Sequence, residues 1–176
     1  KSLLVLGWGD SPETDKNRTR LVNYAQEAGF EVQAVDYHEL GRLHRFKNET
    51  LNIMPFFPYT FWNKNCEIPD DTKLYGTSKR AYDLFADFLL DIQDKLETKF
   101  STHNLLFTTP LASAALDRDK IQTLQILNGY GVSTSEMVAY ERVQDILNQV
   151  TPERGVFIKC RYGAEGKGIT LITPER

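Results

Sequence analysis

The sequence predicts an α/β protein: a layered parallel-sheet domain over residues 1–116, then a smaller lobe over residues 117–176. Three observations lead to this. The chain opens with an apolar run that ends in a glycine-containing turn. A helical pattern and a second strand-like run follow, and strand–helix–strand units cross over right-handedly and set their strands parallel. Near the end, a glycine-rich segment joins two strand-like runs.

The composition is that of a folded globular protein. Of 176 residues, 41% are hydrophobic and 26% charged, which excludes disordered and collagen-like chains. The net charge is -3, so the overall charge attracts neither nucleic acid nor an anionic membrane surface. The apolar run before Gly7 is too short for a signal peptide or a membrane span. We therefore expect no nucleic-acid or membrane partner, and we leave a homo-oligomer open.

The two cysteines favour a reducing, cytoplasmic compartment. Cys66 and Cys160 lie too far apart in sequence for a CxxC pair and are too few for a disulfide framework, so we interpret them as packing residues. The chain begins with Lys1, and it stops at Arg176 just after a strand-like run. Both ends are expected to be cuts in a longer chain.

The first third of the chain predicts one strand–helix–strand unit and then a loss of periodicity. Strands are expected at residues 2–6 and 31–36, with a helix from Thr14 or Asp15 to Gly29 between them. Residues 37–75 are crowded with aromatic residues and prolines, and are expected to form an irregular excursion or short strands. The aromatic run 56–62 is assigned to the core or an interface.

The rest of the chain alternates helical and strand-like patterns. Apolar residues at spacings of three and four predict a long helix from Thr77 to Leu96. Further helices are expected at residues 112–116, 121–129 and 143–150, and strands at 103–108, 133–140, 155–159 and 169–172.

The glycine-rich segment is the first candidate site. Glycines let backbone N–H groups approach a polyphosphate, and a lysine adds positive charge. A P-loop is excluded because Arg161 and Gly168 stand where its glycine and hydroxyl residue belong, and because no helix follows. A glycine-rich hairpin with a solvated lysine stays an open alternative. The segment comprises Gly163, Ala164, Glu165, Gly166, Lys167 and Gly168.

The turn after the first strand is a weaker candidate. A dinucleotide fingerprint would need glycine where Pro12 stands. The turn still lies at the carboxyl end of a strand, where open α/β sheets bind ligands, so Gly9, Asp10 and Ser11 are candidate substrate contacts. A simple strand-to-helix turn is the favoured alternative. Three lone histidines and the basic run 42–47 are assigned structural or solvated roles: His38, His44 and His103.

The second half of the chain resembles the ATP-grasp superfamily of carboxylate-amine ligases. The resemblance rests on Leu-Ala-Ser-Ala-Ala-Leu-Asp-Arg-Asp-Lys at 111–120, on the segments at 123–127 and 131–133, and on Val-Phe-Ile-Lys at 156–159 with the glycine-rich segment and strand that follow. It is most similar to the branch of ribosomal protein S6 glutamate ligases and glutathione synthetases.

The resemblance implies a function and its residues. Lys120 and Lys159 would contact ATP phosphates, and the loop of Gly163, Gly166 and Gly168 would close over them. The part before the lobe would be a pre-ATP-grasp domain that helps to hold the acceptor. ATP would convert a small-molecule carboxylate to an acyl phosphate, which an amine then attacks.

The resemblance also implies that the chain is the N-terminal part of such an enzyme. Magnesium ligands would lie beyond Arg176, and the chain alone would not be a complete ligase. The alternative hypothesis is a non-catalytic nucleotide- or protein-binding module on a degenerate or truncated ATP-grasp scaffold.

Overall fold

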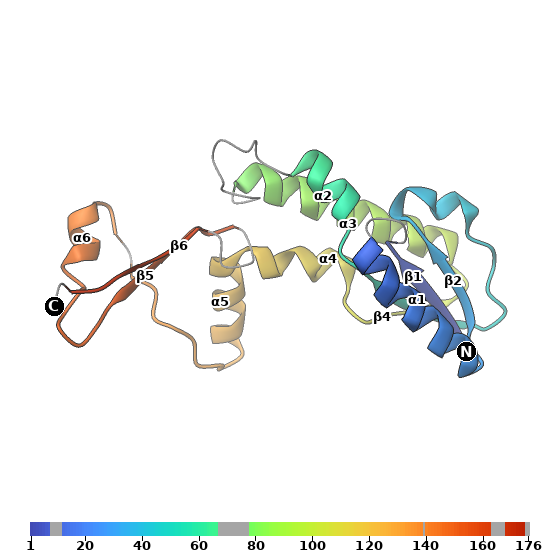
Figure 1. Cartoon of the computed structure of the whole chain (residues 1–176). Helices are drawn as coiled ribbons and strands as arrows, with labels where there is room; N and C mark the ends of the chain where they lie inside the picture. Colours follow the sequence, from blue (N-terminus) through green and yellow to red (C-terminus); the bar gives the residue numbers. More distant parts are fainter. Residues whose placement is uncertain (8–11, 67–77, 139, 163–167, 175–176) are drawn as a thin grey trace. The chain divides into compact units, whose positions relative to one another are not determined.

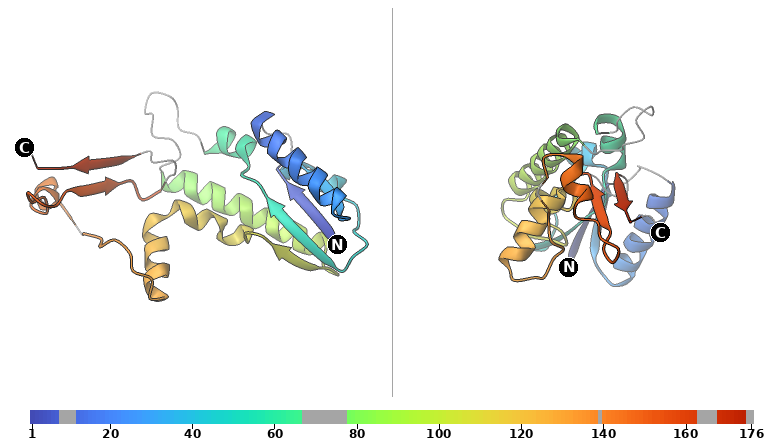
Figure 2. Two further views of the ribbon diagram at one scale, coloured as in Figure 1. Left: turned by 60° about the horizontal axis from the view of Figure 1, so that its bottom comes forward. Right: turned by 90° about the vertical axis from the view of Figure 1, so that its left-hand side faces the viewer.

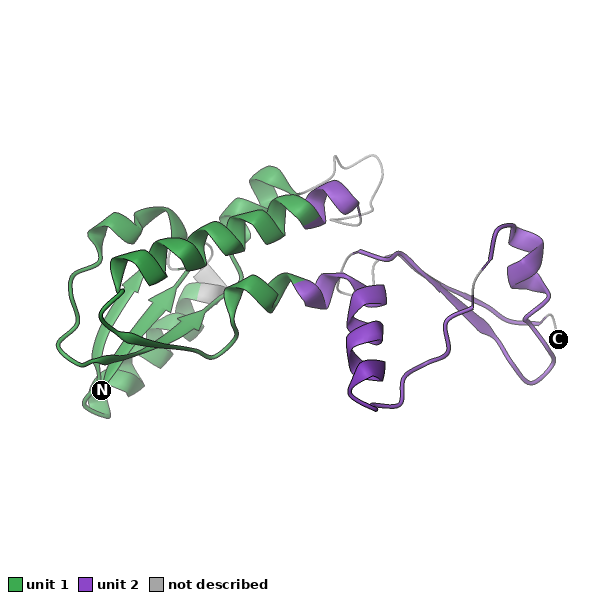
Figure 3. Ribbon diagram, turned by 180° about the vertical axis from the view of Figure 1, so that it is seen from behind, with its two compact units in different colours: residues 1–67, 83–115 green, residues 68–82, 116–176 purple. Residues whose placement is uncertain are grey.

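The computed structural model describes residues 1–7, 12–66, 78–138, 140–162 and 168–174 (Figure 1). The chain divides into two compact units, residues 1–67 with 83–115 and residues 68–82 with 116–176 (Figure 3). The predicted α/β class is confirmed, because unit 1 holds a four-stranded parallel sheet together with helices. The functional identities that the sequence assigns to its two parts stay predictions.

Unit 1 is built on a parallel sheet with the strand order β2-β1-β3-β4. Strand β1 (Ser2–Leu6) is flanked by β2 (Glu31–Val35) and β3 (Thr50–Pro55), and β4 (Asn104–Phe107) forms the far edge. Strand β1 is buried along its whole length, which explains its continuous apolar run.

Helix α1 (Pro12–Glu27) covers one face of this sheet (Figure 2). Leu21 and Val22 pack against a cluster formed by Ala25 of the same helix with Leu3 and Val5 of β1. Alternate residues of a strand point to opposite faces, so Leu3 and Val5 share the α1 face. The strand–helix–strand unit predicted from the first 36 residues is confirmed.

Helix α3 (Lys79–Lys99) covers the opposite face (Figure 2). Its buried side chains in unit 1 recur at spacings of three and four, which is the apolar stripe that the sequence predicted. The sheet presents Leu4, Leu51 and Ile53 on this side, and all three are fully buried. The stripe is formed by Phe85, Leu89, Ile92 and Leu96.

Residues 37–66 are more regular than the sequence indicated. A 3-10 helix, η1 (Tyr37–Arg42), leads into β3, which is an internal strand of the sheet. Helix α2 (Tyr59–Asn65) follows and was not predicted. It contains only seven residues and one fully buried side chain, Trp62. Its sequence therefore shows no repeat of buried apolar residues at helical spacing.

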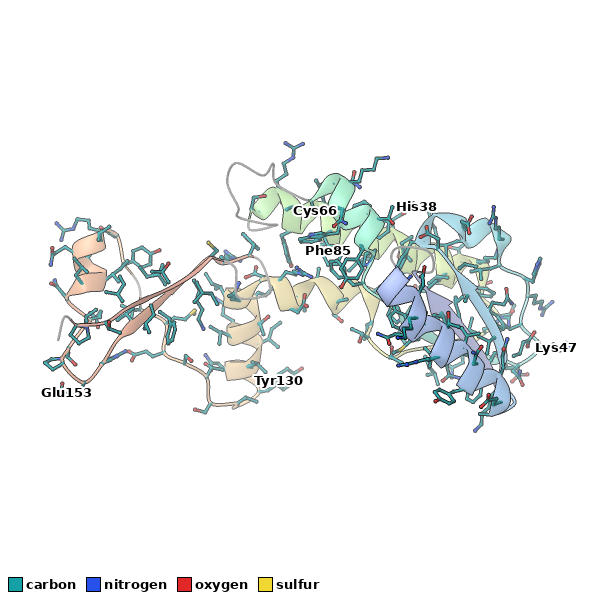
Figure 4. All side chains as sticks on the ribbon, in the orientation of Figure 1. His38, Lys47, Cys66, Phe85, Tyr130 and Glu153 are labelled. Atoms are coloured by element: carbon teal, nitrogen blue, oxygen red, sulfur yellow. The ribbon has the colours of Figure 1, made fainter. Side chains whose placement is uncertain are left out.

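The aromatic run, predicted to lie in the core or an interface, contributes Trp62 to the core, whereas Tyr59 is 39% exposed. The rings of Phe57 and Trp62 lie 5.5 Å apart, and each packs against Phe85 of α3, at 5.5 and 5.1 Å. The side chain of Phe85 points into this cluster (Figure 4). Phe61 stacks on Phe88 with a centroid distance of 3.8 Å.

The later elements begin with α4 (Leu111–Ala114) and the 3-10 helix η2 (Ala115–Arg118). Unit 2 continues with α5 (Lys120–Gly129), α6 (Val143–Leu147) and an antiparallel pair, β5 (Val156–Lys159) and β6 (Ile169–Ile172).

The strand predicted at residues 133–140 is wrong. The described residues of this stretch form no ladder with another strand. Met137 and Tyr140 are 49% and 58% exposed, so the apolar residues that suggested a strand face solvent rather than a sheet partner.

Candidate functional site

The candidate site begins at the start of α5, where Asp119 forms the N-cap. Its Oδ1 accepts hydrogen bonds of 3.1 Å from the backbone N–H groups of Ile121 and Gln122. Aspartate is among the best residues at this position because the first N–H groups of a helix have no partner within it. The cap fixes the backbone from which Lys120, the first residue of α5, projects.

Arg161, which follows β5, forms a bidentate ion pair with the same carboxylate. Its Nε donates to Oδ1 of Asp119 at 2.9 Å, and its Nη2 donates to Oδ2 at 2.7 Å. The side chain of Asp119 is 2% exposed and that of Arg161 is 47% exposed. The bonds from Arg161, reinforced by the backbone donors, hold the pKa of Asp119 below its usual value.

The backbone joins these two segments as well. The N–H of Lys120 donates to the carbonyl oxygen of Arg161 at 3.1 Å, and Asp119 forms an isolated antiparallel bridge with Tyr162. Asp119 and Arg161 are 42 positions apart in the sequence. The beginning of α5 and the chain that leaves β5 are therefore bound together by side-chain and main-chain hydrogen bonds.

The side chain of Lys120 reaches the end of β5, where Lys159 stands. Nζ of Lys120 donates to the carbonyl oxygen of Cys160 at 3.0 Å, and Lys159 is the residue before. Burial lowers the pKa of Lys120, and the positive charge of Lys159 acts in the same direction. Lys120 thus contacts the main chain next to Lys159, whose own Nζ lies 5.6 Å from the centre of the Phe157 ring.

The strands on either side of the glycine-rich segment form the predicted hairpin. Lys159 pairs with Ile169 in the antiparallel ladder, and the N–H of Cys160 donates to the carbonyl oxygen of Gly168 at 2.9 Å. Gly168 has a φ of +68°, a conformation that favours glycine. The other candidate residues lie outside the described residues, so their phosphate-binding role stays a prediction: Gly163, Ala164, Glu165, Gly166 and Lys167.

The candidate substrate contacts Gly9, Asp10 and Ser11 also lie outside the described residues. Arg18 of α1 is fully buried, and its Nη2 lies 3.5 Å from where a Cβ on Gly7, which follows β1, would stand. It forms a 3.0 Å ion pair with Asp15, and its guanidinium lies 5.3 Å from the ring centre of Phe56. A paired arginine of α1 thus lies beside the residue that follows β1, and no sequence pattern pointed to it.

The histidines, the cysteine and the basic run described next were assigned structural or solvated roles, and their surroundings fit those roles. Nε2 of His103 lies 3.2 Å from the carbonyl oxygen of Phe46, and the ring of His38 packs near Phe88. Cys66 is buried, as expected of a packing residue. Lys47, in the basic run, is exposed at the surface (Figure 4).

No group of three or more His, Cys, Asp or Glu side chains within the described ranges is arranged to hold a metal ion. The magnesium ligands that the resemblance implies would lie beyond Arg176, so they stay a prediction. None of the helices in the described part of the chain is both long and apolar enough to cross a bilayer.

The pairing of Arg161 with Asp119 was missed by sequence reasoning. Asp119 itself carried a readable signal, since an aspartate directly before a helical pattern is a typical N-cap. Arg161 carried none, because a polar residue after a strand is ordinarily solvated and its partner is distant in the sequence.

Comparison of the chain with protein-family models, with curated proteins and with solved structures gives no significant match.

Proposed function

We propose that this chain contributes the phosphate-binding lobe of an ATP-dependent, ADP-forming carboxylate-amine ligase of the ATP-grasp type, as its N-terminal part. One observation carries the proposal: Nζ of Lys120 bonds to the carbonyl oxygen of Cys160, so that Lys120, at the start of α5, reaches the end of β5 where Lys159 stands. The substrates would be a small-molecule carboxylate and an amine. Two isolated cysteines fit a cytoplasmic location.

The charges of the site suit this chemistry. A carboxylate is a poor electrophile, and ATP would supply the phosphoryl group that makes it reactive towards the amine. Phosphoryl transfer depends on positioning and on stabilising negative charge around the phosphorus. Lys120 and Lys159 would supply two positive charges for that purpose, and the glycine-rich segment follows β5 in the sequence.

The proposal is tested by measuring ADP release by the purified full-length product of the gene that encodes this chain, with magnesium-ATP and pools of amino acids and small carboxylates. We expect release that requires both a carboxylate and an amine. It should be lost in Lys120→Ala and in Lys159→Ala. Lys95→Ala is the matched control, because Lys95 is exposed on α3 and pairs with Asp91 within the same helix.

Each alternative outcome has a distinct meaning. ADP release that survives both alanine substitutions contradicts the phosphate assignment. ATP binding without turnover, lost in the same two variants, favours the non-catalytic nucleotide-binding module. Absence of ATP binding and of ADP release overturns the proposal.

A further inference from the structure

The proposed chemistry uses the two lysines but gives no role to the ion pair beside them. Asp119 is the most enclosed charged group of the site, and its two oxygens accept four hydrogen bonds. Three groups share Oδ1, and Nη2 of Arg161 takes Oδ2. Such a carboxylate joins a helix start to a strand end more firmly than either backbone contact alone.

The consequence of this link falls on Lys120. The lysine is covalently attached to Asp119, and its own N–H donates to Arg161. Its side chain reaches the carbonyl oxygen of Cys160, the residue before Arg161. Loosening the ion pair would therefore change the distance between α5 and the end of β5, which sets the separation of Lys120 from Lys159.

The pair also fixes one end of the connection between β5 and β6. Tyr162, next to Arg161, bridges to Asp119, while Cys160 bonds to Gly168 across the hairpin. The chain is thus paired with Asp119 at Tyr162 and hydrogen-bonded to Cys160 at Gly168, on either side of residues 163–167 in the sequence.

We propose that Asp119 and Arg161 are positioning residues that hold Lys120 and Lys159 at the spacing a polyphosphate requires. The inference rests on the proposed function and adds to it a requirement for the ion pair. Neither residue needs to touch the phosphates. Nε and Nη2 of Arg161 both donate to Asp119, whose negative charge balances the positive charge of the guanidinium.

The direction in which one substitution changes the affinity for tripolyphosphate distinguishes positioning of the lysines from an effect of overall charge. Asp119→Asn removes a negative charge beside the site and keeps a good N-cap. If overall charge alone governed binding, this variant would bind inorganic tripolyphosphate more tightly. If the ion pair positions the lysines, it binds more weakly, by about tenfold, which is the loss expected for one charged hydrogen bond.

The experiment measures the dissociation constant for tripolyphosphate, at a temperature where each variant is folded. Arg161→Lys is the second variant: it keeps the charge, loses the planar fork, and changes a half-exposed side chain. The matched control is Asp145→Asn at the start of α6, where the carboxylate accepts from the N–H of Arg142 at 2.9 Å. We expect weaker binding in the first two variants and no change in the control.

Amide hydrogen exchange without ligand gives an independent readout. Loss of the pair should speed exchange at the N–H groups of Lys120 and Cys160, but not in the sheet of unit 1. Unchanged exchange overturns the inference, as does equal or tighter binding by Asp119→Asn. If the unchanged protein does not bind tripolyphosphate, the proposed function fails, and faster exchange in the variants still supports the ordering role of the pair.

Discussion

The side-chain nitrogen of Lys120 bonds to the carbonyl oxygen of Cys160 at 3.0 Å, directly beside Lys159. This contact draws a charged amine out of water and towards a second positive charge. Both changes lower the pKa of Lys120, burial being the larger. The lysine therefore loses its proton more readily than a solvated lysine does.

The first prediction is a pH dependence of phosphate binding. A polyphosphate binds the protonated amine, so its affinity is full below the lowered pKa of Lys120 and falls as pH rises through it. The fall should begin below the ordinary lysine pKa of about 10.4. Lys120→Arg should move it to higher pH, because a guanidinium stays protonated. Titrations of tripolyphosphate from pH 7 to 11 check this, and identical profiles for the two proteins would contradict it.

The second prediction concerns acid. The folded pKa of Asp119 lies below its unfolded value of about 3.9. The stability contributed by its ionised form is thus present above that value and is lost as pH falls through the folded pKa. The free energy of unfolding of the unchanged protein should exceed that of Asp119→Asn near pH 7, and the gap should narrow below about pH 4. Denaturant titrations at both pH values measure it; a constant gap would count against the ion pair.

The third prediction tests the core of unit 1 with two leucines. Leu51 lies in the internal strand β3 and is fully buried, so Leu51→Ala should cost about 2–5 kcal/mol of unfolding free energy. Leu106 lies in the edge strand β4 and is 47% exposed, so Leu106→Ala should change it by only about 0.5 kcal/mol. Urea unfolding of both variants makes the comparison, and equal effects would argue against the strand order.

The fourth prediction concerns two glycines in left-handed conformations. At Gly29, φ is +79° and a Cβ would meet nothing within 4 Å, so Gly29→Ala should cost only the backbone strain, about 1–2 kcal/mol. At Gly7, φ is +92° and a Cβ would lie 2.9 Å from the Tyr37 ring. Tyr37 is itself buried, so Gly7→Ala should lower the thermal unfolding midpoint further than Gly29→Ala. The reverse order would refute the packing around Gly7.

Local sequence patterns were sufficient to predict much of the secondary structure. They were insufficient where tertiary packing determines whether a segment becomes a strand. Strand β1 and helix α3 were predicted because each has its own apolar periodicity. Strand β3 was harder to place because Asn52 and Pro55 interrupt its apolar pattern; its position is set by pairing with β1 and β4. The stretch 133–140 shows the opposite error, an apolar pattern without a partner strand among the described residues.

Some residues of the candidate site could likewise be predicted from the sequence, and others could not. Lys120 and Lys159 were singled out because the segments around them resemble the ATP-grasp superfamily, and their role as phosphate contacts stays a prediction. The ion pair of Asp119 with Arg161 could not be predicted, because it joins side chains from distant parts of the sequence and leaves no periodic trace. The hydrogen bond from Lys120 to the carbonyl oxygen of Cys160 also depends on the tertiary structure, and no sequence pattern predicts it.

The central position of β1 in the sheet has a consequence for synthesis of the protein. Strand β1 is made before both of its neighbours, of which β3 ends only at Pro55, and the helix that covers Leu4 comes later still. At about 5–20 residues per second, the ribosome needs several seconds to supply β3 after β1. During that interval an apolar strand has an unpaired edge on the nascent chain, which makes it a natural binding segment for a chaperone.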